Sequence, residues 1–476
     1  MRNLHILTLP RATSGWLWAG ILVLLLAACG TLEAQPPSSE RSTEPVASST
    51  EHAYIATVDV TDTDTPAAIA AAYGGEVVVW RPEAGFAILG LPAPDEAIDT
   101  LDRPTDRPGT RTNLPMPANA VRNEDAFSVP QFDDAVALSV SAWAGSVSAW
   151  AGGVNAWAGG VNAWAGGVNN PFPGNEDYWQ QMQLGQAQDA TTNLGQGVTI
   201  AIIDTGLDLD HVAFTERLAP SGDWLDLVGG DAYPHEGYEE ACIWRAGPNC
   251  KQWSTVKTGD GPFFGHGTGV AGVALQAAPN ATLLPIRVLN SWGHGSATDV
   301  AKAIDHAIER GADVINLSLG TFEPVAAIDQ MVAYAGELGI AVVMASGNTG
   351  DKNVWYPAAT AAGPDYPHAI SVGSVDAADV KSWFSTYGLL ETLAPGEGIS
   401  TLYPGDALAY AIGTSFATPW VTGTVALILG DGGFLADASP TVVAESDGID
   451  HLNPSWAGLL GSGRLNTLKA VNQALN

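Results

Sequence analysis

The sequence predicts an α/β protein with a mainly parallel central sheet that helices cover on both faces, preceded by a small α+β unit. Beyond Asn175, near-continuous apolar runs rich in β-branched residues alternate with segments of helical spacing. Strands buried on both faces have this composition, and their alternation with helices is typical of parallel sheets. A shorter mixture of the same two signals occupies residues 52–92 and predicts the smaller unit.

The N-terminus has the pattern of an export signal. Arg2 and Arg11 precede an apolar run over residues 16–28, which is shorter than the roughly 20 apolar residues of a spanning helix; such a helix is the weaker alternative. The segment Leu26-Ala27-Ala28-Cys29 resembles a bacterial lipoprotein processing box, which implies that Cys29 becomes the lipidated first residue. We therefore assign residues 1–29 to a signal peptide and expect a secreted or cell-surface protein.

Residues 30–51 are rich in Pro, Ser, Thr and Glu and predict a flexible tether. In the unit at 52–92, residues 54–58 predict a strand, residues 66–73 a helix and residues 76–91 two strands.

Residues 93–174 predict a linker. Within it, the heptads at 140–167 repeat a Trp at the same point, at Trp143, Trp150, Trp157 and Trp164. Glycine pairs in these heptads oppose helix, so the repeats indicate a low-complexity spacer, with an aromatic docking strip as the alternative.

The main domain, at 175–476, carries the strongest strand and helix signals. We predict strands at 198–203, 283–289, 313–317 and 340–345, and helices at 298–310 and 324–338. Acidic residues number 51 and basic ones 19, a formal charge of −32. Such a surface repels nucleic acid and anionic lipid, which leaves a lipid anchor as the means of membrane contact.

Polar residues stand where these strands end. Asp204, Ser318 and Ser346 each follow an apolar run, while His266 and Ser415 each open a predicted helix after small residues. Because the carboxyl ends of parallel strands meet at one edge of a sheet, we expect these side chains to gather there.

These residue types suit nucleophilic catalysis. A serine hydroxyl needs a base that takes its proton and a third group that orients the base, and His and Asp supply these roles. Asn348 and the backbone N–H of Ser415 are candidate donors to the negative charge that develops on the substrate oxygen.

Three segments carry a resemblance to the subtilisin-like serine proteases: Asp204-Thr-Gly206, His266-Gly-Thr268 and Gly413-Thr-Ser-Phe-Ala-Thr-Pro419, in the family's order. The resemblance implies a three-layer catalytic domain over 175–476. It also implies that Ser415 is the nucleophile, His266 the general base, Asp204 its orienting carboxylate, and Asn348 with Ser415 the oxyanion hole. No cofactor is needed for this chemistry.

The same resemblance implies an endopeptidase that acts on extracellular proteins or peptides. Its substrate-binding segments would be Ser318-Leu319-Gly320 and Ser291-Trp292-Gly293, together with Ser346-Gly347. An uncharged residue is expected on the acyl side of the cleaved bond. Asp208 and Asp210 leave structural calcium open.

The chain departs from the family's common pattern in three places. Phe416 and Trp420 stand where Met and His are more usual, and 62 positions separate Asp204 from His266. An insertion at about 219–257 fills this interval and contains Cys242 and Cys250, for which a disulfide and two free thiols both remain open.

The unit at 52–92 resembles the family's inhibitory propeptide. This implies self-cleavage, which we predict between Asp134 and Asn175, whereas a non-inhibitory structural domain is the alternative. Two other functions compete with the protease: a catalytically silent surface binding protein on the same scaffold, and a serine esterase. The esterase is disfavoured because Ser415 lacks a Gly-x-Ser-x-Gly elbow.

Overall fold

The computed structural model describes residues 52–92, 171–236, 263–366 and 368–475, and the backbone of 121–122, 127–128, 238–246 and 249–257. The predicted signal peptide with Cys29, the tether and the Trp repeats lie outside the described residues. None of the described helices combines enough length with enough hydropathy to cross a membrane.

The N-terminal unit is a small antiparallel sheet with one helix. Its strands lie in the order β2-β3-β1-β4 and its elements are β1 Tyr54–Asp59, α1 Pro66–Tyr73, β2 Glu76–Arg81, β3 Phe86–Leu91 and β4 Val121–Arg122. Helix α1 begins where predicted because Thr65 accepts a hydrogen bond from the backbone N–H of Ala68 and Pro66 occupies the first turn. It ends at Gly74, which adopts the left-handed conformation. The strands and helix predicted here are confirmed.

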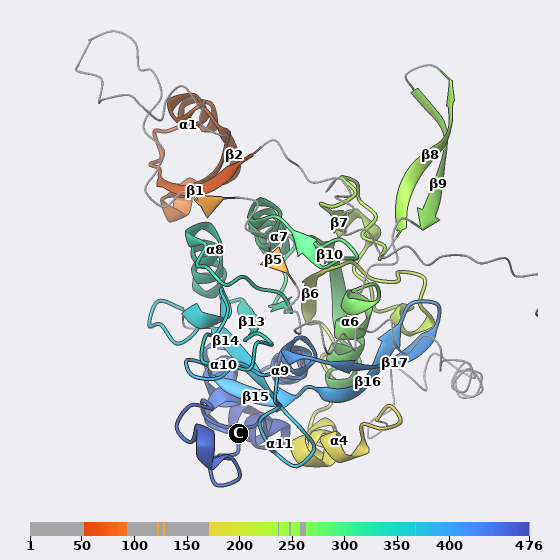
Figure 1. Ribbon diagram of the computed structural model, residues 1–476, viewed down its shortest axis with the longest axis vertical. Coiled ribbons are helices and arrows are strands. Elements are labelled where there is room, and N and C mark those ends of the chain that lie inside the picture. The colour runs from red at the N-terminus through yellow and green to blue at the C-terminus, as the bar shows by residue number, and fades with distance from the viewer. Residues whose placement is uncertain are drawn as a thin grey trace, which may run out of the picture. The chain divides into compact units, whose positions relative to one another are not determined.

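The main domain is built on a seven-stranded sheet in the order β15-β14-β13-β12-β6-β10-β7 (Figure 1). All of its strand pairs are parallel. The strands are β6 Thr199–Asp204, β7 Leu225–Asp226, β10 Thr282–Arg287, β12 Val314–Leu317, β13 Ala341–Ala345, β14 Ala369–Val375 and β15 Thr392–Pro395. The predicted strand at 283–289 ends early, at Arg287, because the next two N–H groups bond to the carbonyl oxygen of Asp204.

Helices cover both faces of this sheet. They are α6 His266–Ala277, α7 Ala297–Glu309, α8 Ala326–Glu337 and α9 Thr414–Gly430. Alternate residues of β6 point to opposite faces: Ile200 and Ile202 pack in one hydrophobic cluster with α6 and α9, and Ala201 and Ile203 in another with α7 and α8. The three-layer α/β fold is therefore confirmed.

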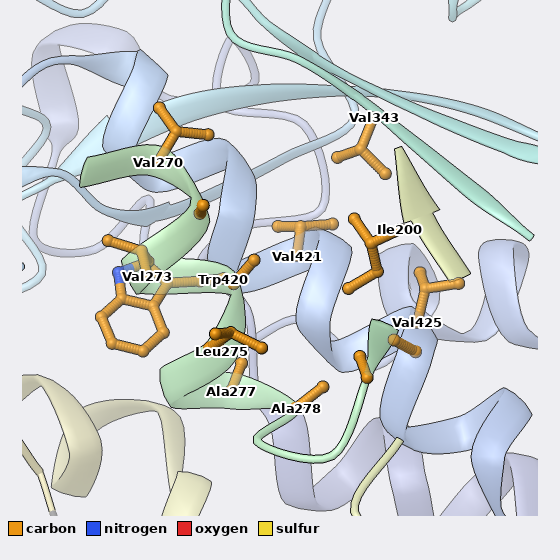
Figure 2. Packing of buried hydrophobic residues seen from close by; sticks show 14 of the residues in the cluster. Ile200, Val270, Val273, Leu275, Ala277, Ala278, Val343, Trp420, Val421 and Val425 are labelled. Carbon is orange, nitrogen blue, oxygen red and sulfur yellow. The ribbon is translucent and has the colours of Figure 1, made fainter. Parts of the chain in front are cut away.

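Figure 2 shows part of the first cluster, in which the buried Trp420 of α9 packs among side chains of α6. Val421 and Val425 of α9 lie toward Ile200 of the sheet. The unusual Trp420 is therefore a core residue.

The other helices and strands surround this sandwich. They are α4 Glu176–Met182, α5 Leu184–Ala190, α10 Leu435–Ala444, α11 Thr467–Leu475, β16 Glu397–Tyr403, β17 Ala407–Ile412, and the short pair β5 Phe127–Ser128 and β11 His294–Gly295. Short 3-10 turns occur at Pro82–Ala84, Val212–Phe214, Ser221–Asp223, Ala358–Thr360 and Pro454–Trp456.

The insertion between Asp204 and His266 contains a β-hairpin, β8 Tyr238–Ala246 and β9 Asn249–Lys257. Its register places Cys242 opposite Trp253 and Cys250 opposite Arg245. The two cysteines are therefore not partners in this ladder. Their disulfide stays a prediction, and it would require a shift of the register.

Candidate active site

The carboxyl edge of the sheet gathers the polar residues that the sequence placed at the strand ends. Asp204 is the last residue of β6, and Ser318 directly follows β12, its neighbour in the sheet. Ser346 follows β13, which pairs with β12. Asp204, Ser318 and Ser346 are all fully buried at this edge.

Asp204 and His266 form a buried hydrogen-bonded pair. The Nδ1 atom of His266 lies 2.7 Å from Oδ1 of Asp204, and the N–H of Thr205 donates to the same oxygen at 2.7 Å. A Cβ atom on Gly267 would collide with the carbonyl oxygen of Gly206 and lie 3.2 Å from the Cβ of Asp204. The glycine after His266 thus allows α6 to approach β6 closely enough for this bond.

Ser415 lies in the first turn of α9. Its Oγ donates to the carbonyl oxygen of Ser318 at 3.3 Å. Among the residues that the structure describes, none hydrogen-bonds to Nε2 of His266. The first turn of α9 nevertheless lies beside His266, because the ring of Phe416, the residue after Ser415, packs edge-on against the imidazole with centroids 5.2 Å apart.

Asn348 is held against the loop that carries Ser415. Its Oδ1 accepts hydrogen bonds from the N–H of Thr414 at 2.9 Å and from the hydroxyl of Thr414 at 3.0 Å. These bonds fix which end of the amide faces Thr414, and its Nδ2 lies 3.3 Å from the position that a Cβ on Gly413 would take. The glycine at 413, with φ +143°, places no side chain against this end of the amide.

The predicted substrate-binding segments lie at the same edge. Ser318, Leu319, Ser291, Ser346 and Gly347 are buried, and Trp292 is 52% exposed. Gly320 approaches Tyr356, whose carbonyl oxygen would lie 2.9 Å from a Cβ at that position. Just beyond Gly293, β11 pairs antiparallel with β5, so a segment from upstream in the chain lies alongside this region as an extended strand.

The carboxylate of Asp208, a candidate calcium ligand, already contacts other groups of the protein. Its carboxylate accepts a hydrogen bond from the N–H of Gly405 at 2.7 Å and lies 3.3 Å from Nε2 of His235. Burial acts to raise the pKa of Asp208, but the bonds from His235 and Gly405 outweigh it and the pKa is lowered. The described residues contain no cluster of three or more His, Cys, Asp or Glu side chains suited to a metal. Calcium binding stays a prediction.

Two features of the site were not predicted from the sequence. One is the contact of Phe416 with His266, and the other is Glu236, a fully buried carboxylate whose hydrogen bonds reach the residues that follow Asp204 and His266. Glu236 lies in the insertion, and no local pattern distinguishes it from a surface acid.

A parallel α/β sheet with an Asp–His pair and a helix-borne serine at one edge is typical of serine hydrolases. The model described as the subtilase family matches residues 195–438 of the chain. The chain therefore belongs to the subtilase family and is a serine endopeptidase.

The chain is also similar to individual proteins. Thermitase from Thermoactinomyces vulgaris is 35% identical over 304 residues, which cover 63% of this chain and 98% of thermitase. Subtilisin Savinase from Lederbergia lenta is 35% identical over 245 residues, covering 49% of this chain and 77% of the relative. The crystal structure of a cold-adapted subtilisin-like serine proteinase aligns with a TM-score of 0.44 at 27% identity, covering 54% of this chain and 84% of that one.

Proposed function

We propose that the protein is an exported, self-maturing endopeptidase that cleaves peptide bonds through an acyl-enzyme on Ser415. The observation that carries the residue roles is the buried 2.7 Å bond between Asp204 and His266. This bond fixes the proton on Nδ1 of the imidazole, which leaves Nε2 as the base.

In the proposed first step, Oγ of Ser415 turns from the carbonyl oxygen of Ser318 toward Nε2 of His266. The imidazole takes the hydroxyl proton while Oγ attacks the substrate carbonyl carbon, and Asp204 stabilises the resulting imidazolium. The side chain of Asn348 and the N–H of Ser415 donate to the oxyanion. His266 then protonates the leaving amine, and water repeats the sequence to release the acyl group.

The N-terminal unit is proposed to act as an intramolecular inhibitor. Arg81 of β2 donates to Asp305 of α7 at 2.7 Å and to Glu309 at 3.1 Å, and Phe86 packs against Tyr334 of α8 with ring centroids 5.5 Å apart. Downstream of this unit, β5 pairs with β11 beside the proposed substrate-binding region. A chain that pairs there as an extended strand resembles a bound peptide, which supports self-inhibition.

We propose that maturation cuts the chain between Ser128 and Phe172. From the sequence alone we predict that the cut lies after Asp134. We now extend the upstream limit of the cut to Ser128, because β5, which ends there, already lies alongside β11. The downstream limit is set by residues that the folded domain holds: Phe172 is 4% exposed, and Asn175 donates to Gln276 at 2.8 Å and to the carbonyl oxygen of Ser400 at 2.8 Å. If Cys29 is lipidated, this cut releases the catalytic domain from its anchor.

Hydrolysis of casein by the purified chain, with Ser415→Ala as its control, tests the catalytic assignment. We expect cleavage by the wild type and none by the variant. Equal activity of both proteins would refute the role of Ser415, no activity in either would favour the silent binding protein, and hydrolysis of esters without peptides would favour the esterase.

Processing and anchoring are tested separately in an expression host that exports lipoproteins. N-terminal sequencing of the mature wild type should begin between residues 129 and 172, and Ser415→Ala should remain uncut. Metabolic labelling with a fatty acid should mark the uncut chain, and Cys29→Ser should abolish the label. An uncut but active wild type would contradict self-maturation.

A further inference from the structure

Glu236 is a completely buried carboxylate in the middle of the insertion, just before the hairpin of β8 and β9. Its backbone N–H donates to the carbonyl oxygen of Leu207 at 2.9 Å, and the adjacent His235 pairs with Leu207 in an isolated parallel bridge. The segment that carries Glu236 is thus fastened to the loop that follows Asp204. The insertion therefore delivers one acidic side chain into the interior next to the catalytic centre.

Both carboxylate oxygens of Glu236 accept hydrogen bonds from residues of the two motifs. Oε1 accepts from the hydroxyl of Thr205 and from the N–H of Gly267 at 3.3 Å. Oε2 accepts from the N–H of Thr268 at 3.1 Å and from its hydroxyl at 2.6 Å. Thr205 directly follows Asp204, and Gly267 and Thr268 directly follow His266, so one carboxylate joins the two backbones.

The N-terminus of helix α6 is a favourable environment for the carboxylate of Glu236. The first N–H groups of a helix have no partner within it, and Gly265 at the N-cap has no side chain that can accept them. Glu236 accepts from two of these groups, and its negative charge lies at the positive end of the helix dipole. The residue that begins this helix is His266.

The hydrogen bonds offset part of the cost of burying Glu236. Burial raises the pKa of Glu236, and the hydrogen bonds from Thr205 and Thr268 act in the opposite direction without outweighing it. A buried carboxylate that lost them would be strongly disfavoured, so the carboxylate and its four donors constrain one another.

We infer that Glu236 is a positioning residue for catalysis: it clamps the first turn of α6 to the loop after Asp204 and thereby holds the imidazole of His266 in register with Asp204 and Ser415. This inference rests on the proposed roles of those residues. Glu236 does not contact substrate; it acts on kcat through the placement of His266. A misplacement of about 1 Å is enough to lower a rate about a hundredfold.

Glu236→Gln tests the inference, because it keeps the shape but presents an NH2 group to donors that need an acceptor. We expect kcat on a peptide substrate to fall between about tenfold and a hundredfold, with KM within about twofold of the wild type. Glu236→Asp, which keeps the charge on a shorter side chain, should recover part of the loss. The low-field proton resonance of the His266 Nδ1–H should shift or broaden in Glu236→Gln.

Asp313→Asn is the matched control. Asp313 also accepts a hydrogen bond from a backbone N–H of β6, that of Thr199 at 2.8 Å, but at the opposite end of the strand. Its substitution should lower stability and leave kcat and the low-field resonance unchanged. A drop in kcat of the same size in this control would show that general destabilisation explains the effect.

Thr205→Val decides the question if Glu236→Gln fails to fold, because it removes one donor and keeps the carboxylate. We expect a smaller loss of kcat with an unchanged KM. A folded Glu236→Gln, or in its place a folded Thr205→Val, with kcat within twofold of the wild type would overturn the inference. An inactive wild type would instead refute the proposed function.

Discussion

Pro419 lies four residues after Ser415 in helix α9, so it cannot donate the N–H that would ordinarily bond to the carbonyl oxygen of Ser415. The hydroxyl of Ser318 donates to that oxygen instead, at 2.8 Å. Ser318 in turn accepts from Nδ2 of Asn316 at 3.0 Å, and Thr422 donates to Oδ1 of Asn316 at 2.8 Å. The missing backbone hydrogen bond at Pro419 and the buried polar chain together tie the turn that carries the nucleophile to β12.

This relationship predicts that Ser318→Ala lowers the free energy of unfolding by about 1–3 kcal/mol, since it leaves a buried carbonyl oxygen without a donor. Adding Pro419→Ala should recover part of the loss, because an alanine at that position would supply the missing N–H. Urea unfolding in a Ser415→Ala background, which prevents self-digestion, measures both effects. Strictly additive losses in the double variant would contradict the link between Ser318 and the missing N–H at Pro419.

Because Phe416 replaces an oxidisable residue beside the catalytic histidine, we predict that the peptidase activity resists oxidation. Its ring packs against His266, at a position where Met is more usual in the family. A methionine sulfoxide there would place a polar group beside the imidazole. We expect hydrogen peroxide to inactivate Phe416→Met and to spare both the wild type and Phe416→Leu, as measured by residual peptidase activity. Equal loss in all three proteins would place the sensitive group elsewhere.

Asp329, in the first turn of α8, predicts a pH dependence of stability. Burial raises its pKa from 3.8 to about 7. Because the folded state binds this proton more tightly than the unfolded chain, stability falls as pH rises from about 4 to about 7. Asp329→Asn should therefore raise the melting temperature at pH 8 by about 5 °C and change it little at pH 4.

The measurement is thermal unfolding of both proteins in the Ser415→Ala background. The control is Asp437→Asn, which changes an exposed acid in the first turn of α10. A gain for Asp329→Asn that is the same at both pH values would exclude titration of Asp329 as its cause.

The core strands and first helix were predictable because their signals are local. Thr65, Pro66 and Gly74 mark the ends of α1, and the runs that form β6, β12 and β13 are almost purely apolar. Strand β14 was not predicted because Ser371, Gly373 and Ser374 interrupt its apolar pattern, although the fold buries them. The hydroxyls of Ser371 and Ser374 have partners outside the strand, the N–H of Glu391 and the hydroxyl of Ser382.

The candidate site likewise contains residues that could be predicted from the sequence and residues that could not. The three motifs could be recognised because each is a short run of adjacent residues, and the structure brings Asp204 and His266 within hydrogen-bonding distance. Glu236 could not be recognised, since a lone acid in an insertion is indistinguishable from a surface residue until the fold buries it. The donors that define its role, Thr205 and Thr268, lie 31 and 32 positions away.

Trp355 predicts which side chain the enzyme accepts on the acyl side of the cleaved bond. Its indole lies against Gly347, where an added Cβ would be 2.7 Å from the indole Cγ, and its Cβ lies 3.4 Å from the position of a Cβ on Gly320. The backbone N–H of Trp355 donates to the carbonyl oxygen of Ser346 at 2.9 Å. The indole, 2% exposed, thus fills the space between the two segments proposed to flank that substrate side chain.

We therefore expect the wild type to prefer small residues, and Trp355→Ala to admit large ones. The ratio of kcat/KM for a peptide with Phe before the cleaved bond to that for the matching Ala peptide should rise at least tenfold in the variant. Loss of stability alone lowers both kcat/KM values together and leaves their ratio unchanged. Phe434→Ala, which removes an exposed aromatic side chain before α10, is the control and should also leave the ratio unchanged. If the wild type already cleaves both peptides equally well, the space beside Gly347 is not where the substrate side chain binds.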